Sequence, residues 1–445
     1  MTISKKLLRY FDERDPQNEE RISQDIKRHR MGWGTICFHN EKGQPISISE
    51  DYKIDIRQVT HDFKFGSTLF MLEGFESKEK NADFENYFLQ IFNHGIAPFF
   101  WNDLEPRDGE LRFSAKSEPI YRRPPPDLLV DWANKNNVSL KGHSLVWDRK
   151  LFHPEYAPDD HKGIAKRLSR HIKEIAERYG EKIETWDVIN EAIGYPNVTM
   201  PDDRVFWSFN EANKYFPSDA KLVYNEGTEP SWMYYRPDTS WNFLLLQNLL
   251  LRGARVDGAG LQYHHFTSEP EVMNGRTDTL LNPGYLLRVL DQYARLGLTI
   301  NISEVTIPMF KQLPDGEDLQ ASLMKELYRV WFSHSNVDGI TLWNMVDGTA
   351  HTRVDWDQNT LFAGILDEKL KPKASFHALD NLINKEWKTN MQMLGNGGNS
   401  IKFQGFYGNY EISLTKDSKR IVKQVHVSKT SPNNFTLTWD NSKSQ

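Results

Sequence analysis

The feature that most constrains the fold is a repeated alternation between about residue 60 and residue 385. Short apolar runs rich in β-forming residues alternate there with longer amphipathic stretches, which is typical of βα units and a parallel sheet. In the stretch 161–180, apolar residues recur every three or four positions and Gly180 supplies a helix end. The candidate strands are residues 63–70, 95–100, 138–143, 184–190, 220–225, 258–263, 298–304 and 338–343. Eight such units predict an α/β protein built on a (β/α)8 TIM barrel.

The two ends of the chain predict a second, β-rich part. Residues 1–60 contain a helical stretch at about 17–30 and two short strands, WGTICFHN and YKIDIRQV. Residues 387–445 contain three alternating strands, at 400–416, 420–429 and 433–440. We therefore expect a catalytic barrel over 61–386 and a small β-sandwich-like accessory module formed by both terminal segments. Its aromatic residues Phe406, Tyr407 and Tyr410 fit a module core, with a sugar-binding surface as the alternative.

Composition excludes several classes of function. No apolar run approaches the roughly 20 residues that span a bilayer, so a membrane partner is not expected. The net charge is -6 and the basic residues are scattered, so nucleic acid is not expected either. Cys37 is the sole cysteine and no zinc-type spacing occurs, so the sequence predicts no disulfide, metal or cofactor. The N-terminus lacks an apolar signal region, which fits a cytoplasmic chain or one already trimmed, and oligomeric state is left open.

Two glutamates follow predicted strands and suggest the chemistry. Glu191 stands just past the fourth strand in ETWDVINEA, and Glu304 ends the seventh strand in LTINISE. In such barrels the reactive groups lie at the carboxyl ends of the strands. Two carboxyl groups about 5 Å apart are the machinery of a retaining glycosidase, in which an amide such as Asn190 can bind the sugar 2-hydroxyl. One such glutamate alone would be an ion-pair partner or helix cap, but this pair favours catalysis.

At this point the chain resembles glycoside hydrolase family 10, whose members are mostly endo-β-1,4-xylanases on a TIM barrel. WDVINEA is similar to the acid/base motif of that family, and INISEVTIP is similar to its nucleophile motif. Further similar segments follow in the family's order. They are GHSLVWD (142–148), KLVYNEG (221–227), DGAGLQYHHF (257–266), GITLWNMVDG (339–348) and LKPKASFHAL (370–379). The resemblance covers roughly residues 60–385.

The resemblance implies a role for individual residues. Glu191 becomes the general acid/base and Glu304 the nucleophile of a retaining hydrolase acting on an oligosaccharide or polysaccharide. The residues implied to contact the sugar or orient Glu304 are His143, Asn190, Tyr224, Gln262 and His264, and the implied hydrophobic walls are Trp147 and Trp343. Structural packing is the alternative for each histidine and tryptophan. His265 should face away from His264, and Trp186 and Asp187 should brace the fourth strand.

Departures from the family pattern bear on the substrate. The family's second strand carries a Glu-Asn pair with a downstream lysine. In this chain the corresponding segment is Ala97 and Pro98 followed by FFWNDLEP (99–106). Trp101 and its neighbours are expected to stack on sugar or to wall off that subsite. Asp148 and Thr306 replace a histidine and an aspartate, and a tryptophan of the last loop is lost or displaced to Trp356.

The loop SEPIYRRPPP (117–126) after the second strand looks like an insertion. Its two arginines, Arg122 and Arg123, fit a solvated surface pair, with recognition of a uronic acid as the alternative.

Three functions compete. The first is a retaining endo-β-glycanase, with xylan as the favoured substrate. The second is an exo-acting or narrow-specificity β-glycosidase that uses the same glutamates on a different plant or algal polysaccharide. The third is a catalytically silent carbohydrate-binding barrel, which has no chemical need for both carboxylates and Asn190. A sugar-phosphate enzyme is disfavoured because no Gly-rich phosphate loop follows the last two strands.

Overall fold

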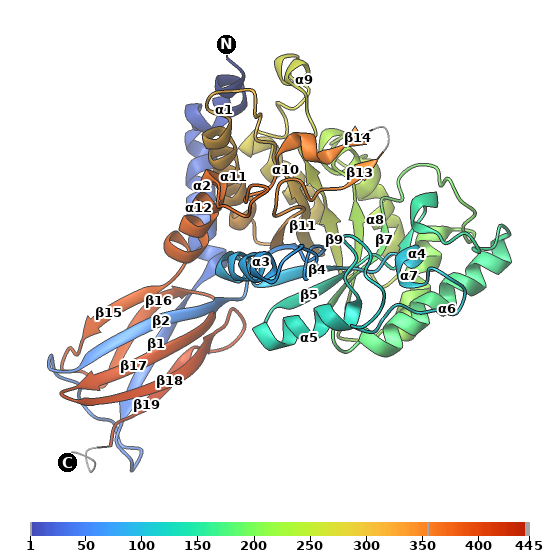
Figure 1. Ribbon diagram of the computed structural model, residues 1–445. Coiled ribbons are helices and arrows are strands. Elements are labelled where there is room, and N and C mark those ends of the chain that lie inside the picture. The colour runs from blue at the N-terminus through green and yellow to red at the C-terminus, as the bar shows by residue number, and fades with distance from the viewer. Residues whose placement is uncertain (1, 354–355, 441–445) are drawn as a thin grey trace. The chain divides into compact units, whose positions relative to one another are not determined.

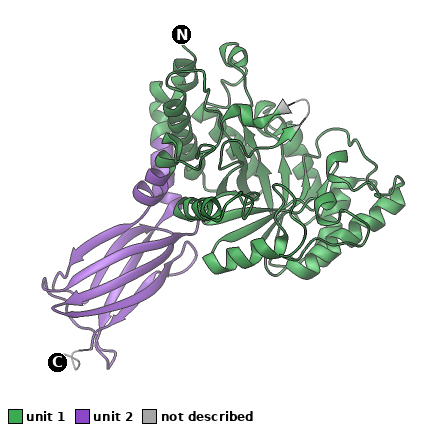
Figure 2. Ribbon diagram, in the orientation of Figure 1, with its two compact units in different colours: residues 1–19, 64–379 green, residues 20–63, 380–445 purple. Residues whose placement is uncertain are grey.

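The computed structural model describes residues 2–353 and 356–440 (Figure 1). The chain forms two compact units, one of residues 1–19 with 64–379 and one of residues 20–63 with 380–445 (Figure 2). The terminal segment 1–60 is therefore divided between them. Its first helix, α1 (Ile3–Glu13), was not expected from the sequence; it contacts α9 (Glu269–Met273) and α11 (Gly316–Ser333) of the first unit, and it buries Leu7 and Phe11.

The first unit is a closed parallel barrel, which confirms the predicted fold class. Its strands are β3 (Lys64–Thr68), β4 (His94–Pro98), β5 (Ser139–His143), β7 (Thr185–Asn190), β8 (Lys221–Glu226), β9 (Gly258–Leu261), β11 (Thr299–Thr306) and β12 (Val337–Leu342). Neighbours pair in parallel in this order, and β9 and β12 both pair with β11 while β12 also pairs with β3, so the ring closes. Short strands β6 (Val146–Trp147) and β10 (Tyr263–His264) extend two positions of the ring.

Helices follow most of the strands and form the outer layer (Figure 1). They are α3 (Lys78–Ile91), α5 (Pro126–Asn136), α6 (His161–Tyr179), α7 (Arg204–Tyr215), α8 (Trp241–Leu251), α10 (Pro283–Ala294), α11 and α12 (Ala374–Asn381). In α6, Asp160 caps the first turn by accepting hydrogen bonds from the backbone of Lys162 and Gly163. Its apolar stripe, which includes Ile164 and Leu168, is buried, as the three- and four-residue spacing predicts.

The second unit contains two sheets built from both ends of the chain. One sheet has the order β16 (Ser400–Phe406), β1 (Met31–His39), β19 (Asn434–Thr438). The other has the order β15 (Asn390–Leu394), β2 (Lys53–His61), β17 (Gly408–Lys416), β18 (Lys419–Val427). N-terminal strands thus pair with C-terminal ones, as the sequence predicts. The helix α2 (Pro16–Arg30) matches the stretch expected at about 17–30.

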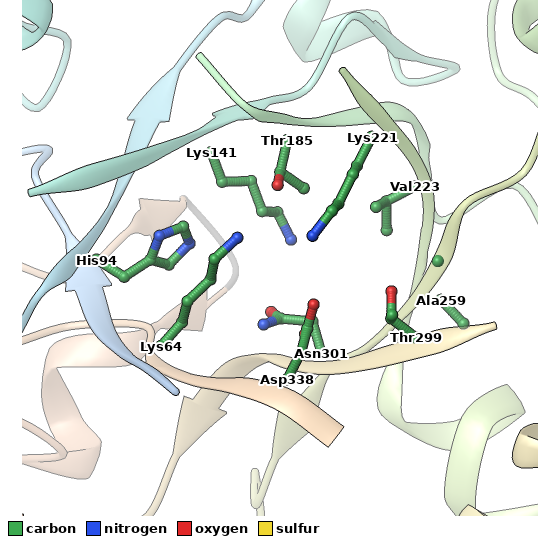
Figure 3. Close-up of a pocket in the computed structure, with 11 residues that line it drawn as sticks. Lys64, His94, Lys141, Thr185, Lys221, Val223, Ala259, Thr299, Asn301 and Asp338 are labelled. Atoms are coloured by element: carbon green, nitrogen blue, oxygen red, sulfur yellow. The ribbon is translucent and has the colours of Figure 1, made fainter. Parts of the chain in front are cut away.

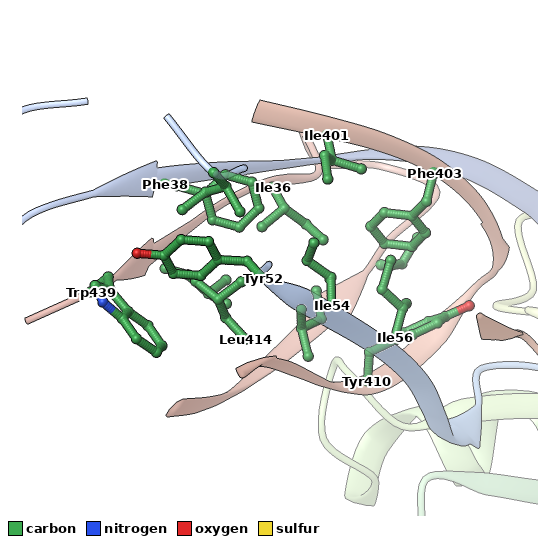
Figure 4. Close-up of a cluster of buried hydrophobic side chains, with 14 residues drawn as sticks. Ile36, Phe38, Tyr52, Ile54, Ile56, Ile401, Phe403, Tyr410, Leu414 and Trp439 are labelled. Carbon is green, nitrogen blue, oxygen red and sulfur yellow. The ribbon is translucent and has the colours of Figure 1, made fainter. Parts of the chain in front are cut away.

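The strand expected over 400–416 is in fact two strands in different sheets. The chain breaks at Gly408, which has a φ of 150° and whose missing side chain would collide with the carbonyl oxygen of Thr60. Figure 4 shows the apolar residues that fill this unit, among them Ile36, Ile54 and Tyr410. Phe406 and Tyr410 are buried, and the Tyr410 hydroxyl donates to the Phe406 carbonyl oxygen at 2.5 Å. These two aromatics are core residues of the module, and Tyr407 packs partly buried against the same cluster.

Within the described residues, no helix is both long and apolar enough to cross a bilayer. The same part of the chain holds no group of three or more His, Cys, Asp or Glu side chains arranged to bind a metal ion.

Candidate active site

The two ends of the barrel differ in the space they offer. At the carboxyl ends of the strands lies a cleft of about 1050 Å³, and Glu191, Gln262, His264 and Glu304 are among the residues lining it. At the opposite end, a cavity of only about 10 Å³ is lined by residues near the strand starts, with lysine ammonium groups pointing into it (Figure 3). These lysines have partners: Lys64 and Lys221 lie 3.2 and 3.0 Å from a carboxylate oxygen of Glu184. The large cleft is the candidate active site.

The two predicted catalytic carboxylates both line this cleft. Glu304 is buried near the end of β11, whereas Glu191 is partly buried in the residue directly after β7. Glu191 has a positive φ of 49°, an uncommon conformation for a residue with a side chain. Such a backbone persists only where the surrounding structure holds it, and it is often found at functional sites.

A chain of buried amides connects the two carboxylates. The Nε2 group of Gln262 donates to Glu191 Oε1 at 3.0 Å and lies 3.4 Å from Asn190 Oδ1. Asn225 Nδ2 donates to the same Asn190 oxygen at 2.7 Å and to Glu304 Oε1 at 2.7 Å. The two carboxylates therefore occupy one hydrogen-bonded network.

The sequence analysis did not single out Asn225, although its position at the end of a barrel strand is a usable signal. It pairs in register with Asn190 on the neighbouring strand. A side chain at Gly260 would collide with the Asn225 amide oxygen, so the glycine makes room for this residue. Ser303 donates to that oxygen at 2.6 Å and fixes the amide orientation.

Two histidines, His264 and His143, flank Glu304. His264 Nε2 lies 3.1 Å from Glu304 Oε2, and its other ring nitrogen lies 2.8 Å from the Thr306 hydroxyl. His143 Nε2 lies 3.9 Å from Glu304 Oε1, and its Nδ1 lies 2.8 Å from Asp187. Thr306, which stands where the family motif has aspartate, thus contacts the His264 ring through its hydroxyl. His265 faces elsewhere and bonds to Thr267.

The electrostatic environment of Glu191 disfavours its ionised form. Burial raises the pKa of Glu191, and the nearby charge of Glu304 raises it further. A carboxyl group whose pKa is raised holds its proton into the working pH range of an enzyme, as a general acid must.

The loop after Glu191 is held by a buried ionic network. Arg204 donates to the carbonyl oxygens of Ala192 and Gly194, each at 2.7 Å. Its guanidinium is paired with Asp148 at 2.8 Å, and this carboxylate is completely buried. Asp148 therefore has a clear structural purpose where the family motif has histidine: it anchors the arginine that fixes the loop carrying the Glu191 carboxylate.

A third carboxyl group, Glu226, supports the same loop and was also not singled out from the sequence. It accepts hydrogen bonds from the backbone N–H groups of Ile193 at 3.0 Å and Gly227 at 2.8 Å, and from the hydroxyl of Tyr224. Burial raises the pKa of Glu226 to about 7. Tyr224 itself is fully buried and does not line the cleft; its hydroxyl supports the site through Glu226.

Aromatic residues form one wall of the cleft. Trp147 stacks on Phe152 with ring centroids 3.9 Å apart, and both line the cleft. Trp343 also lines it and makes edge contacts with Phe70 at 5.5 Å and with His264 at 5.9 Å. Flat apolar faces next to polar groups are typical of carbohydrate sites, and here they lie beside Glu304 and its histidine.

Trp101 is placed differently from the expectation. It lies in the short helix α4 (Trp101–Leu104), is buried, and donates from Nε1 to Glu105 Oε2 at 3.1 Å. It does not line the cleft; of the segment 99–102, only Phe100 does. Helix α4 turns the Trp101 ring toward His153 and His171, so its aromatic character serves packing. The side chain of Trp356 lies outside the described part of the structure.

Comparison with known proteins agrees with this geometry. Endo-1,4-beta-xylanase A of Caldicellulosiruptor saccharolyticus is 28% identical over 285 residues, which is 56% of this chain and 77% of that protein. Anti-sigma-I factor RsgI6 of Acetivibrio thermocellus is 23% identical over 406 residues, which is 91% of this chain and 47% of that protein. Native xylanase 10B from Thermotoga maritima has the same barrel fold, with a TM-score of 0.57 at 21% identity over 73% of this chain and 96% of that chain.

The fold and site define a barrel enzyme that acts on glycosidic bonds. The family model described as glycosyl hydrolase family 10 matches residues 100–382, and the chain belongs to that family. It is a glycoside hydrolase of the endo-1,4-β-xylanase-like type.

Proposed function

We propose that this protein cleaves β-1,4-linked xylan or a closely related β-glycan by double displacement with retention of the anomeric configuration. Glu304 attacks the anomeric carbon and forms a glycosyl-enzyme intermediate. Glu191 protonates the leaving oxygen and then activates water for the second step. The observation that carries the proposal is the hydrogen-bonded chain through Gln262 and Asn225 that ties both carboxylates into one site within the cleft.

The environment of each carboxylate supports its role. Glu304 accepts a hydrogen bond from Asn225, and His264 Nε2 lies 3.1 Å from its other oxygen, so both of its oxygens are held in place as a nucleophile requires. Glu191 is the carboxyl group whose pKa is raised, which suits a proton donor. The substrate assignment is supported by the xylanases among the relatives.

The test combines stereochemistry with two substitutions. A panel of xylan, mixed-linkage glucan and aryl β-glycosides, with product anomers followed by NMR, should show cleavage with the β-anomer formed first. Glu304→Gln should abolish turnover even of activated aryl glycosides. Glu191→Ala should retain activity on aryl glycosides whose leaving group needs no proton, and added azide should raise that activity by replacing the activated water. Initial formation of the α-anomer, or wild-type rates in both variants, would contradict the mechanism.

A second candidate is an exo-acting or narrow-specificity β-glycosidase with the same two glutamates. It is favoured by the absence of the family's polar Glu-Asn-Lys set on the second strand, where Phe100 now packs 4.7 Å from Phe152. Product profiles separate the two candidates, because an endo enzyme releases a series of oligomers and an exo enzyme releases one short product from the start of the reaction.

A further inference from the structure

The loop 117–126 brings Arg122 and Arg123 to the active-site cleft instead of exposing them to solvent. Both arginines line the cleft, and Arg122 is only 6% exposed. The buried side chain of Arg112 fixes this loop by donating to the carbonyl oxygens of Asp103, Glu118 and Arg123 at 2.6–3.0 Å. The loop is therefore held in place by hydrogen bonds and forms part of the cleft wall.

Arg122 differs from the other arginines of the cleft because no carboxylate among the described residues pairs with it. Arg123 pairs with Asp103 at 2.6 Å, Arg149 with Asp148 at 2.6 Å, and Arg276 with Glu229 at 2.8 Å. Among the described residues, the only hydrogen-bond acceptor for the Arg122 side chain is the carbonyl oxygen of Thr349, to which Nη1 donates. Its Nε group is buried and has no hydrogen-bond partner among them.

A buried guanidinium without a counter-ion is costly, so its position calls for a ligand. Burial lowers the pKa of Arg122 to about 9, with a further decrease from the charge of Arg123, and the group therefore stays protonated at neutral pH. The backbone of Arg122 has a positive φ of 61°, which a side-chain-bearing residue rarely adopts.

The location of Arg122 links it to the reactive centre. Its guanidinium lies 5.5 Å from the centre of the Phe70 ring, and Phe70 lies edge-on to Trp343. Trp343 in turn contacts His264, which bonds to Glu304. A sugar bound along this aromatic wall would therefore extend from the nucleophile toward Arg122.

We propose that Arg122 binds the carboxylate of a uronic acid carried by the glycan, in the part of the cleft next to the cleavage site. A planar guanidinium matches a carboxylate with two parallel N–H donors, and the Nε donor of Arg122 has no hydrogen-bond partner within residues 2–353 and 356–440. The inference rests on the proposed hydrolase function and specifies its substrate as an acidic, decorated β-glycan.

The test uses one oligosaccharide in two forms. A xylo-oligosaccharide bearing a glucuronic acid side group is compared with the same compound after reduction of its carboxyl group to a hydroxymethyl group. The wild type should show a higher kcat/KM for the carboxylate form. In Arg122→Gln and Arg122→Met, the ratio of the two kcat/KM values should fall by about 10- to 100-fold, because a charge-assisted hydrogen bond is lost. In Arg122→Lys the ratio should fall less, since lysine retains the positive charge but lacks the two parallel N–H donors of the guanidinium.

Controls separate this inference from the proposed function. Arg107→Gln removes a positive charge from an exposed ion pair with Glu110 and should leave the ratio unchanged. Equal kcat/KM values for both forms in the wild type would overturn the uronic acid assignment while leaving hydrolysis intact. If neither form is cleaved, the proposed function fails on this glycan, and calorimetric binding of the two forms to the wild type then decides the role of Arg122. Equal affinities there would also overturn it.

Discussion

Asn225 provides the sharpest test of the network that joins the two carboxylates. Its amide donates to Glu304 Oε1 and to Asn190 Oδ1, both at 2.7 Å, in a completely buried position. Asn225→Ala removes a hydrogen bond to a charged group, which is worth about 1.5–3 kcal/mol. If this stabilisation applies fully in the transition state, kcat/KM should fall by about 10- to 150-fold.

The assay is the steady-state hydrolysis of an aryl β-glycoside, because loss at the nucleophile should appear even with a leaving group that needs no proton. Asn225→Asp should lose more activity than Asn225→Ala, since it places a second carboxyl group beside Glu304. Asn242→Ala is the matched control: it deletes another buried amide, which donates to Ser231 Oγ at 3.1 Å, outside the cleft lining. Activity of Asn225→Ala within threefold of the wild type, with normal thermal stability, would refute the reasoning.

Two further predictions concern residues outside the catalytic pair. Burial raises the pKa of Glu226 from 4.5 to about 7, so between these pH values the native state keeps a proton that the unfolded chain has lost. The free energy of unfolding should therefore fall by roughly 3 kcal/mol as pH rises from about 4.5 to about 7. Urea titrations across this range should show that decline to be smaller in Glu226→Gln; equal slopes would contradict the shift. Trp101→Phe loses the hydrogen bond to buried Glu105 and should cost about 1–3 kcal/mol of stability with kcat/KM unchanged, whereas Trp147→Ala should raise KM. A raised KM in Trp101→Phe would contradict this prediction and indicate that Trp101 contacts the substrate.

Local sequence patterns were sufficient to predict the barrel. Each predicted strand agrees with an observed barrel strand to within two residues at both ends, because buried parallel strands appear in the sequence as short apolar runs. The same logic located Glu191 and Glu304, since the carboxyl ends of barrel strands converge on one face whatever the loops do. The family resemblance is confirmed by the match over residues 100–382.

Other features depend on contacts between segments far apart in the chain. The sequence cannot tell that helix α4 turns Trp101 away from the cleft while Phe100 faces it, because both aromatics fit the same local pattern. Nor does the spacing of Asn225 reveal that Gly260 on the next strand leaves space for its amide.

The sequence by itself determined the barrel and the position of the two carboxylates at strand ends, since these follow from periodicity and from the order of the strands. The tertiary structure alone decided which polar groups are buried without partners. Arg122 shows the difference: in sequence it is one of two adjacent basic residues in a loop. Only the packing of that loop on the cleft wall leaves its guanidinium enclosed, with no carboxylate partner in the described part of the chain. Burial and ion pairing depend on residues that are far apart in the sequence and close in the fold, so no local pattern encodes them.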